Sequence, residues 1–123
     1  MRLLLFVGSG SFVGGVSRYL LSQIIHSKYT TEFPVGTLGV NILGCLLIGI
    51  VFGLSEKLNF AHEWRLFLIT VILGGFTTFS AFSNETFSLL RNGQLGIALT
   101  YIILSVVAGI MATFIGFSLI KLF

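Results

Sequence analysis

The amino-acid sequence predicts an all-α membrane protein that crosses the bilayer with four helices. Three observations support this prediction: 55% of the 123 residues are hydrophobic, only 9% are charged, and the mean hydropathy is +1.05. A typical soluble domain carries about 25% charged residues, which cover its water-facing surface. Because this chain has too few charges for such a surface, lipid is its expected solvent. Its length allows one domain at most, over residues 1–123.

The first predicted span covers residues 3–25, and its only charge is Arg18. A helix needs about 20 apolar residues to cross the hydrocarbon core, and this stretch is long enough. Arg2 and the apolar run after it resemble the start of a signal peptide, but no clear small-residue cleavage site follows. A retained helix is therefore the better interpretation.

The other three predicted spans contain at most one charge each. Residues 35–54 contain no charge, residues 66–90 contain only Glu85, and residues 95–120 again contain none. The connectors between them are short and polar. The single cysteine, Cys45, lies in the second span, where we expect a small apolar packing residue.

The orientation of the four helices is weakly specified by the charges. An even number of spans places both termini on one side, and the side that is richer in Lys and Arg usually faces the cytoplasm. The excess here is small, so two interpretations stay open: one fixed topology with cytoplasmic termini, which the counts slightly favour, and a dual topology. The terminal side would carry Arg2, Lys57, Arg65 and Lys121, and the opposite side Lys28 and Arg91.

Four helices of this length enclose little space, so a transport function would require an oligomer. Two G-x-x-x-G motifs, Gly10/Gly14 and Gly49/Gly53, would let helix backbones approach closely. This signal is weak, because glycine is common throughout the chain.

Polar residues inside the spans are the first candidates for function, because lipid offers them no hydrogen bonds. Asn41 lies in the second span, and Tyr101 and Ser105 lie four residues apart in the fourth, on one helix face. Each of these groups would either bond a neighbouring helix or line a pore, and both interpretations stay open.

The third span is the most polar. It contains the adjacent glycines Gly74 and Gly75, where we expect the helix to break, with carbonyl and amide groups released for ligands. Phe79 and Phe82 are three residues apart and share a helix face. The positive edges of their rings would suit a small anion, whereas ordinary packing is the alternative.

Three motifs resemble those of the Fluc/CrcB family. The segment GGFTTFSAFSNE, residues 74–85, resembles the third-helix signature GG-x-TTFSTFS-x-E, with Ala81 where the family commonly has Thr. Residues 34–44 resemble the second-helix pattern P-x-GT-x-x-x-N-x-x-G, and residues 14–19 the first-helix pattern G-x-x-x-R-y. The motifs occur in the family's order over nearly the whole chain.

This resemblance implies a function and an assembly. It implies a fluoride channel, not an enzyme, that passively exports fluoride across the bacterial inner membrane and so lowers its toxicity. It also implies an antiparallel, dual-topology homodimer in the lipid bilayer with two fluoride paths, and no nucleic-acid partner. The implied fluoride pathway comprises Phe79, Phe82, Asn41, Ser80, Thr37, Tyr101 and Ser105.

The resemblance further implies the sites at either end of this path and at the dimer centre. Arg18 and Glu85 correspond to vestibule positions, and the carbonyls of Gly74 and Thr77 to the ligands of a structural Na⁺. The family's row of hydroxyls on the fourth helix often continues one turn beyond Ser105, but here that position is Gly109.

The chemistry of these residues suits fluoride, which is strongly hydrated and needs neutral hydrogen-bond donors in place of water. Conduction also requires weak binding, which neutral donors and ring edges provide better than Lys or Arg. Two rivals remain. One is a small proton-coupled exporter resembling the small multidrug resistance transporters, which the absence of an acid from the first span disfavours. The other is a non-transporting assembly subunit.

Overall fold

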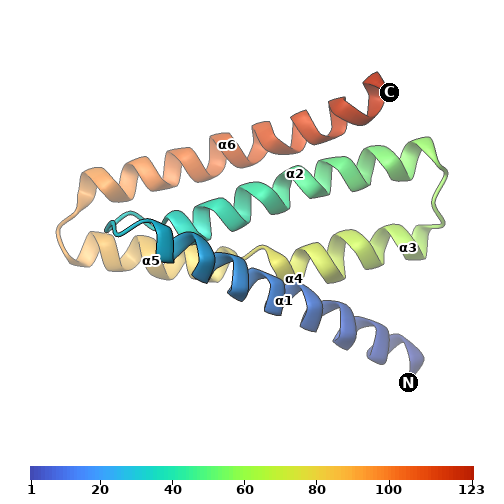
Figure 1. The fold of residues 1–123 in the computed structure, drawn as a ribbon, viewed down its shortest axis with the longest axis horizontal. Coiled ribbons are helices and arrows are strands. Elements are labelled where there is room, and N and C mark those ends of the chain that lie inside the picture. Colours follow the sequence, from blue (N-terminus) through green and yellow to red (C-terminus); the bar gives the residue numbers. More distant parts are fainter.

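Every regular element of the chain is a helix. The computed structural model describes residues 1–123, apart from the side chain of Arg2. Both termini lie at the same end of the molecule, as expected for an even number of crossings (Figure 1). The elements in chain order are α1 (Arg2–Lys28), α2 (Val35–Lys57), α3 (His62–Leu66), η1 (Phe67–Leu73), α4 (Gly74–Phe76), α5 (Phe79–Arg91) and α6 (Leu95–Leu122).

The described residues form four helical segments that are long and apolar enough to cross a membrane, which confirms the predicted four-span fold. The third segment is a composite of α3, η1, α4 and α5. It covers 30 residues, and an 18-residue stretch within it has a mean hydropathy of 1.8. The chain is therefore a multi-pass membrane protein. The four segments are Leu3–Lys28, Val35–Lys57, His62–Arg91 and Leu95–Leu122.

The helices α2 and α6 form the most extensive pair, and they run side by side along most of their length (Figure 1). A side chain at Gly49 of α2 would collide with the backbone carbonyl of Thr113 in α6. A side chain at Gly116 of α6 would likewise collide with the carbonyl of Leu46. The predicted motif Gly49/Gly53 therefore serves close helix packing, which supplies van der Waals contact where lipid gives no hydrophobic drive.

The third span is broken, but not at the predicted place. Gly74 is helical, with φ −65° and ψ −34°, and the glycine pair lies inside α4. The backbone becomes extended at Thr77 (ψ 154°) and Thr78 (φ −147°, ψ 114°). The prediction of a break at Gly74-Gly75 was therefore wrong. Gly75 instead allows α1 to pack closely against α4, because a Cβ atom on Gly75 would lie 3.1 Å from the Ser11 carbonyl oxygen.

The first half of the third span contains a stretch that is not α-helical. Residues Phe67–Leu73 form a π-helix, a form that is rare and short in most proteins. α1 crosses this segment and α4, and the glycines of its predicted motif face them: a Cβ on Gly14 would lie 2.9 Å from the Phe76 amide nitrogen. The motif Gly10/Gly14 thus also mediates close helix contact.

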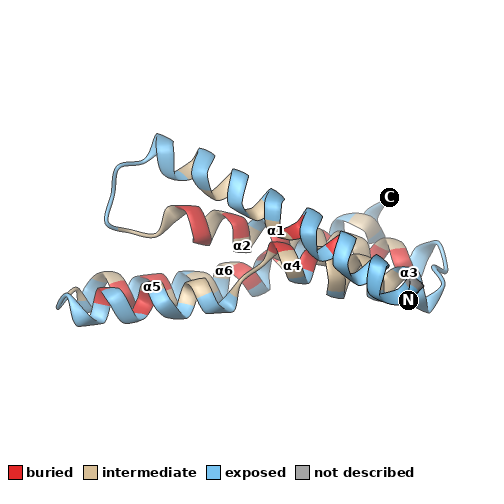
Figure 2. Ribbon diagram, turned by 90° about the horizontal axis from the view of Figure 1, so that it is seen from below, coloured by how far each residue is buried: buried red, intermediate tan, exposed pale blue. Residues whose placement is uncertain are grey.

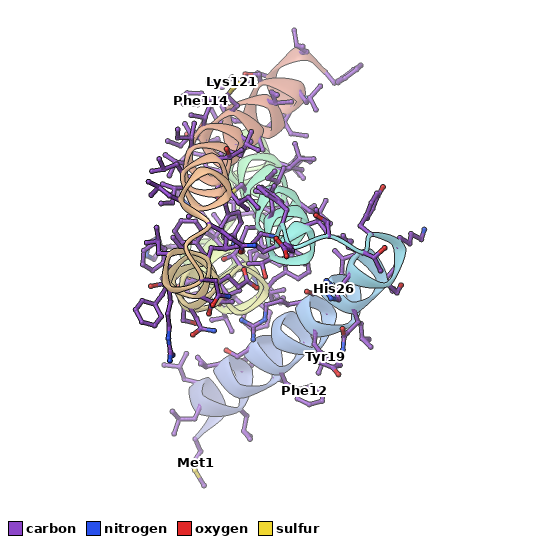
Figure 3. All side chains as sticks on the ribbon, turned by 90° about the vertical axis from the view of Figure 1, so that its left-hand side faces the viewer. Met1, Phe12, Tyr19, His26, Phe114 and Lys121 are labelled. Atoms are coloured by element: carbon purple, nitrogen blue, oxygen red, sulfur yellow. The ribbon has the colours of Figure 1, made fainter. Side chains whose placement is uncertain are left out.

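Much of the apolar surface faces outward, as expected for a chain surrounded by lipid or by another subunit. Exposed residues dominate α1 along its outer side, whereas buried residues gather where α2, α5 and α6 meet the other helices (Figure 2). Phe12 projects from α1 away from the bundle (Figure 3). Tyr101 and Val40 are the largest side chains that are fully buried, and they mark the protein's interior.

Candidate functional site

The helix break is bridged by a side chain from α2. The Thr78 amide donates a hydrogen bond to Asn41 Oδ1 at 2.9 Å, and Asn41 Nδ2 donates to the Thr78 carbonyl at 3.2 Å. Thr78 also caps α5, because its Oγ1 accepts a hydrogen bond from the Ala81 amide at 3.2 Å. Threonine is a favoured residue at this position, since its hydroxyl satisfies an amide at the start of the new helix.

Because of these hydrogen bonds, two backbone amides no longer pair with the carbonyls that they would bond in a continuous helix. The carbonyl of Gly74 would normally accept from Thr78, and that of Thr77 from Ala81. In the structure the Thr78 amide turns to Asn41 and the Ala81 amide to the Thr78 hydroxyl. The break therefore releases the two carbonyls that the sequence analysis associated with Na⁺.

A cavity of about 270 Å³ lies beside the break. Ser105 Oγ is buried against it, and among the described residues it finds no hydrogen-bond partner. A buried hydroxyl without a partner costs free energy unless a ligand or water satisfies it. The cavity is lined by Asn41, Cys45, Ile48, Thr77, Thr78, Phe79, Phe82, Ser105 and Val106.

The two predicted phenylalanines lie together at this cavity. Their ring centroids are 5.6 Å apart, with the planes inclined at 43°. Phe82 also contacts Tyr101, with centroids 5.1 Å apart, and packs against a buried cluster that includes Leu89. Phe79 by contrast is 79% exposed. One ring is therefore fixed by the core of the chain, and the other extends beyond it.

Glu85 is held by hydroxyls from two other helices. Thr37 Oγ1 donates to Glu85 Oε1 at 2.6 Å, and the Tyr101 hydroxyl donates to Glu85 Oε2 at 2.7 Å. In this arrangement the hydroxyl hydrogens of Thr37 and Tyr101 point at the carboxyl group, so Glu85 orients both residues. All three residues were predicted to belong to the site, but their bonds to one another were not predictable from the sequence.

A second cavity, of about 480 Å³, joins both predicted vestibule residues to the break. Ser80 lines it, and its Oγ lies 3.2 Å from Thr78 Oγ1. Thr78 lines both cavities. The second cavity is lined by Arg18, Tyr19, Ser22, Thr37, Val40, Thr78, Ser80, Ala81 and Glu85.

The structure thus brings all the predicted pathway and vestibule residues to two neighbouring cavities or to the hydrogen bonds around them. Among the cavity residues that sequence reasoning missed, Thr78 and Cys45 bear most on the chemistry of the site. Thr78 was recognised only as part of a motif, although threonine is a favoured N-cap residue where a helix restarts. Cys45 was expected to pack, yet it lines the first cavity one turn beyond Asn41.

Comparisons with known proteins agree with this arrangement. The family model described as CrcB-like protein, Camphor Resistance (CrcB), matches residues 5–117. A fluoride-specific ion channel FluC of Flavobacterium psychrophilum is 46% identical over 122 residues, 98% of each chain. The FluC protein of Phocaeicola vulgatus is 48% identical over 114 residues, 93% of each chain. That of Methylobacillus flagellatus is 42% identical over 125 residues, 99% of this chain and 97% of the relative. These matches confirm the resemblance seen in the motifs, and the chain belongs to the CrcB family.

Proposed function

We propose that the protein is a fluoride-selective ion channel, which lets fluoride leave the bacterial cytoplasm passively across the inner membrane and so lowers its toxicity. The relatives that match the chain over nearly its whole length are named fluoride-specific ion channels. The function is that of a membrane channel and not of an enzyme.

The observation that carries this proposal is the cavity beside the helix break. It combines the paired rings of Phe79 and Phe82 with the buried, unpartnered hydroxyl of Ser105. Neutral donors and positive ring edges attract a small anion without a full charge to trap it. Arg18 lines the neighbouring cavity, where it would raise the local anion concentration.

The proposed channel is an antiparallel homodimer of subunits inserted in both orientations. A path through one chain alone would be open on one side, because Phe79, which lines the cavity, is 79% exposed. A copy of the same chain would supply that wall and cover the ring. The difference in Lys and Arg counts between the two ends slightly favours one orientation, but it is small enough to permit insertion both ways.

A Na⁺ ion at the dimer centre belongs to the same proposal, and the break offers suitable ligands for it. The Gly74 and Thr77 carbonyls have been separated from their helical amides, and unwound backbone of this kind coordinates Na⁺ in other membrane proteins. Two chains related by a two-fold axis would provide four such oxygens. The ion would hold the two breaks together and compensate the inward-facing carbonyl dipoles.

The proton-coupled exporter is not favoured. Such an exporter needs a carboxylate that is free to exchange protons with the pathway. The only charge in the predicted first span is Arg18, and both oxygens of Glu85 accept hydrogen bonds from hydroxyl groups. The carboxyl group is thus engaged in orienting its neighbours.

Fluoride efflux from liposomes containing the purified protein distinguishes the functions. A channel that carries fluoride alone builds up a membrane voltage, so efflux should stop early unless the potassium ionophore valinomycin lets K⁺ follow. Efflux that runs to completion without valinomycin, and dissipates an imposed pH gradient, would instead identify a proton-coupled exporter. Liposomes that retain fluoride even with valinomycin would leave the assembly subunit as the remaining function.

A further inference from the structure

Tyr101 and Ser105 lie on one face of α6, and the next position on that face, Gly109, has no side chain. Residues four apart share a helix face, so positions 101, 105 and 109 follow one another along α6. Gly109 is buried and offers no donor of its own. The row of hydroxyls on α6 is therefore interrupted after Ser105. The next hydroxyl on this face, that of Thr113, is engaged by backbone carbonyls.

Cys45 of α2 fills the space opposite this gap. A Cβ atom on Gly109 would lie 3.4 Å from Cys45 Sγ, so the sulfur occupies the position that a side chain at residue 109 would approach. Cys45 follows Asn41 by one turn on α2, and both line the cavity that contains Ser105. The thiol therefore lies on the same cavity wall as the amide and the unpartnered hydroxyl.

The backbone around Cys45 fixes the thiol in this place. Thr113 Oγ1 shares its single hydrogen between the Cys45 carbonyl at 3.1 Å and the Gly109 carbonyl at 3.2 Å. One hydroxyl of α6 thus ties the two residues to a common register. The carbonyl of Cys45 is engaged by this bond, and the residue lines the cavity.

We propose that the Cys45 thiol contacts fluoride in the pathway, and that it replaces on α2 the donor that α6 lacks at Gly109. This inference rests on the proposed fluoride channel. A thiol is a weak hydrogen-bond donor and carries no charge in its protonated form. Such a group continues the row of donors beyond Ser105 without holding the anion tightly, which conduction requires.

The alternative is that Cys45 only fills volume between α2 and α6, and the chain offers a matched set of variants that separates the two roles. Cys45→Ala removes the donor and part of the volume. Adding Gly109→Ser to it returns a donor from the opposite helix into the space vacated by the sulfur. Adding Gly109→Ala instead returns volume without a donor. Cys45→Ser keeps a donor in the original place.

Fluoride efflux from liposomes with valinomycin is the measurement, after size-exclusion chromatography has established that each variant assembles like the wild type. We expect Cys45→Ala to slow efflux roughly three- to tenfold, a change that corresponds to about 0.7–1.4 kcal/mol. Cys45→Ser and the Cys45→Ala/Gly109→Ser variant should conduct close to the wild-type rate, whereas Cys45→Ala/Gly109→Ala should stay slow.

Two results would overturn the inference while leaving the channel itself intact. One is a Cys45→Ala variant that conducts like the wild type. The other is equal rescue by Gly109→Ala and Gly109→Ser, which would assign Cys45 to packing. Wild-type protein that carries no fluoride would instead overturn the proposed function, and the inference with it.

Discussion

Asn41 and Thr78, which are 37 residues apart in the chain, replace a missing turn of helix with two hydrogen bonds. Asn41 Oδ1 accepts from the Thr78 amide at 2.9 Å, and Nδ2 donates to the Thr78 carbonyl at 3.2 Å. An amide side chain can satisfy a peptide group in this way because it carries the same donor and acceptor pair. The relationship makes the interrupted backbone tolerable inside a membrane, where water cannot satisfy it.

Replacing Asn41 with Ala should therefore destabilise the protein as well as slow fluoride efflux. The substitution leaves the Thr78 amide and carbonyl without partners, at a cost of about 1–3 kcal/mol for each unsatisfied buried group. Thermal unfolding in detergent measures the loss. Asn92→Ala is the matched control, because Asn92 lies exposed just after α5 and its loss should leave both the unfolding temperature and the efflux unchanged. Equal stability of the two variants would contradict the bridging role.

Phe82→Ile should slow fluoride efflux roughly three- to tenfold without preventing assembly, because isoleucine keeps most of the apolar bulk and removes the positive ring edge. Phe79→Ile should act in the same direction, since the two rings lie together at the cavity.

Phe76 is another phenylalanine of this span and is not one of the two predicted pathway rings. It would still be a poor control, because it is buried and packs close to Gly14 and Gly44. Phe87, which is 62% exposed on the same helix as Phe82, is better. Efflux should not change in Phe87→Ile. Unchanged efflux in an assembled Phe79→Ile/Phe82→Ile variant would reduce both rings to packing residues.

The Tyr101 hydroxyl and Glu85 should be energetically coupled. Tyr101→Phe removes the bond to Glu85 Oε2 and should destabilise the protein by about 2 kcal/mol, because a half-buried carboxyl group loses a donor. Combined with Glu85→Gln, the two changes should cost less than the sum of the single ones, by about 0.5–3 kcal/mol. The comparison pair is Tyr101→Phe with Ser88→Ala, an exposed position on α5, which should be additive. Additivity in both pairs would exclude a shared hydrogen bond.

Na⁺ should stabilise the dimer if carbonyls of the break hold it. A ligand that binds the folded dimer alone adds about 1.4 kcal/mol for each tenfold rise in its concentration above the dissociation constant. The unfolding temperature in detergent should therefore rise with Na⁺ at constant ionic strength. N-methylglucamine, which is too large for a site of four carbonyls, should give no rise. The same curve with both cations would remove Na⁺ from the proposal.

The four membrane spans were predictable from the sequence because each is a long, mainly apolar stretch with at most one charge, and such stretches depend on composition and not on contacts. The place of the break was not predictable in the same way. Gly75 lies against the backbone of Ser11, and Thr78 is held by Asn41, so tertiary contacts decide which residues of the third span leave the helix. The sequence identified the polar span but carried no signal for these partners.

The residues of the site were likewise predictable only in part from the sequence. Phe79, Phe82 and Ser105 were identified by their spacing and by a family motif, and the structure places them at one cavity. The contribution of Cys45 depends on its proximity to Gly109 on another helix, which nothing near it in the sequence indicates. The bonds of Thr37 and Tyr101 to Glu85 likewise join three separate helices.

The central claim is tested most directly by the selectivity of ion efflux from liposomes that contain the purified protein and valinomycin. One set is loaded with potassium fluoride and a matched set with potassium chloride, and ion-selective electrodes record the release. We predict rapid fluoride release and chloride release no faster than from protein-free liposomes, because the donors and ring edges of the pathway suit a small, strongly hydrated anion. Equal release of the two anions, or retention of fluoride, would contradict the account.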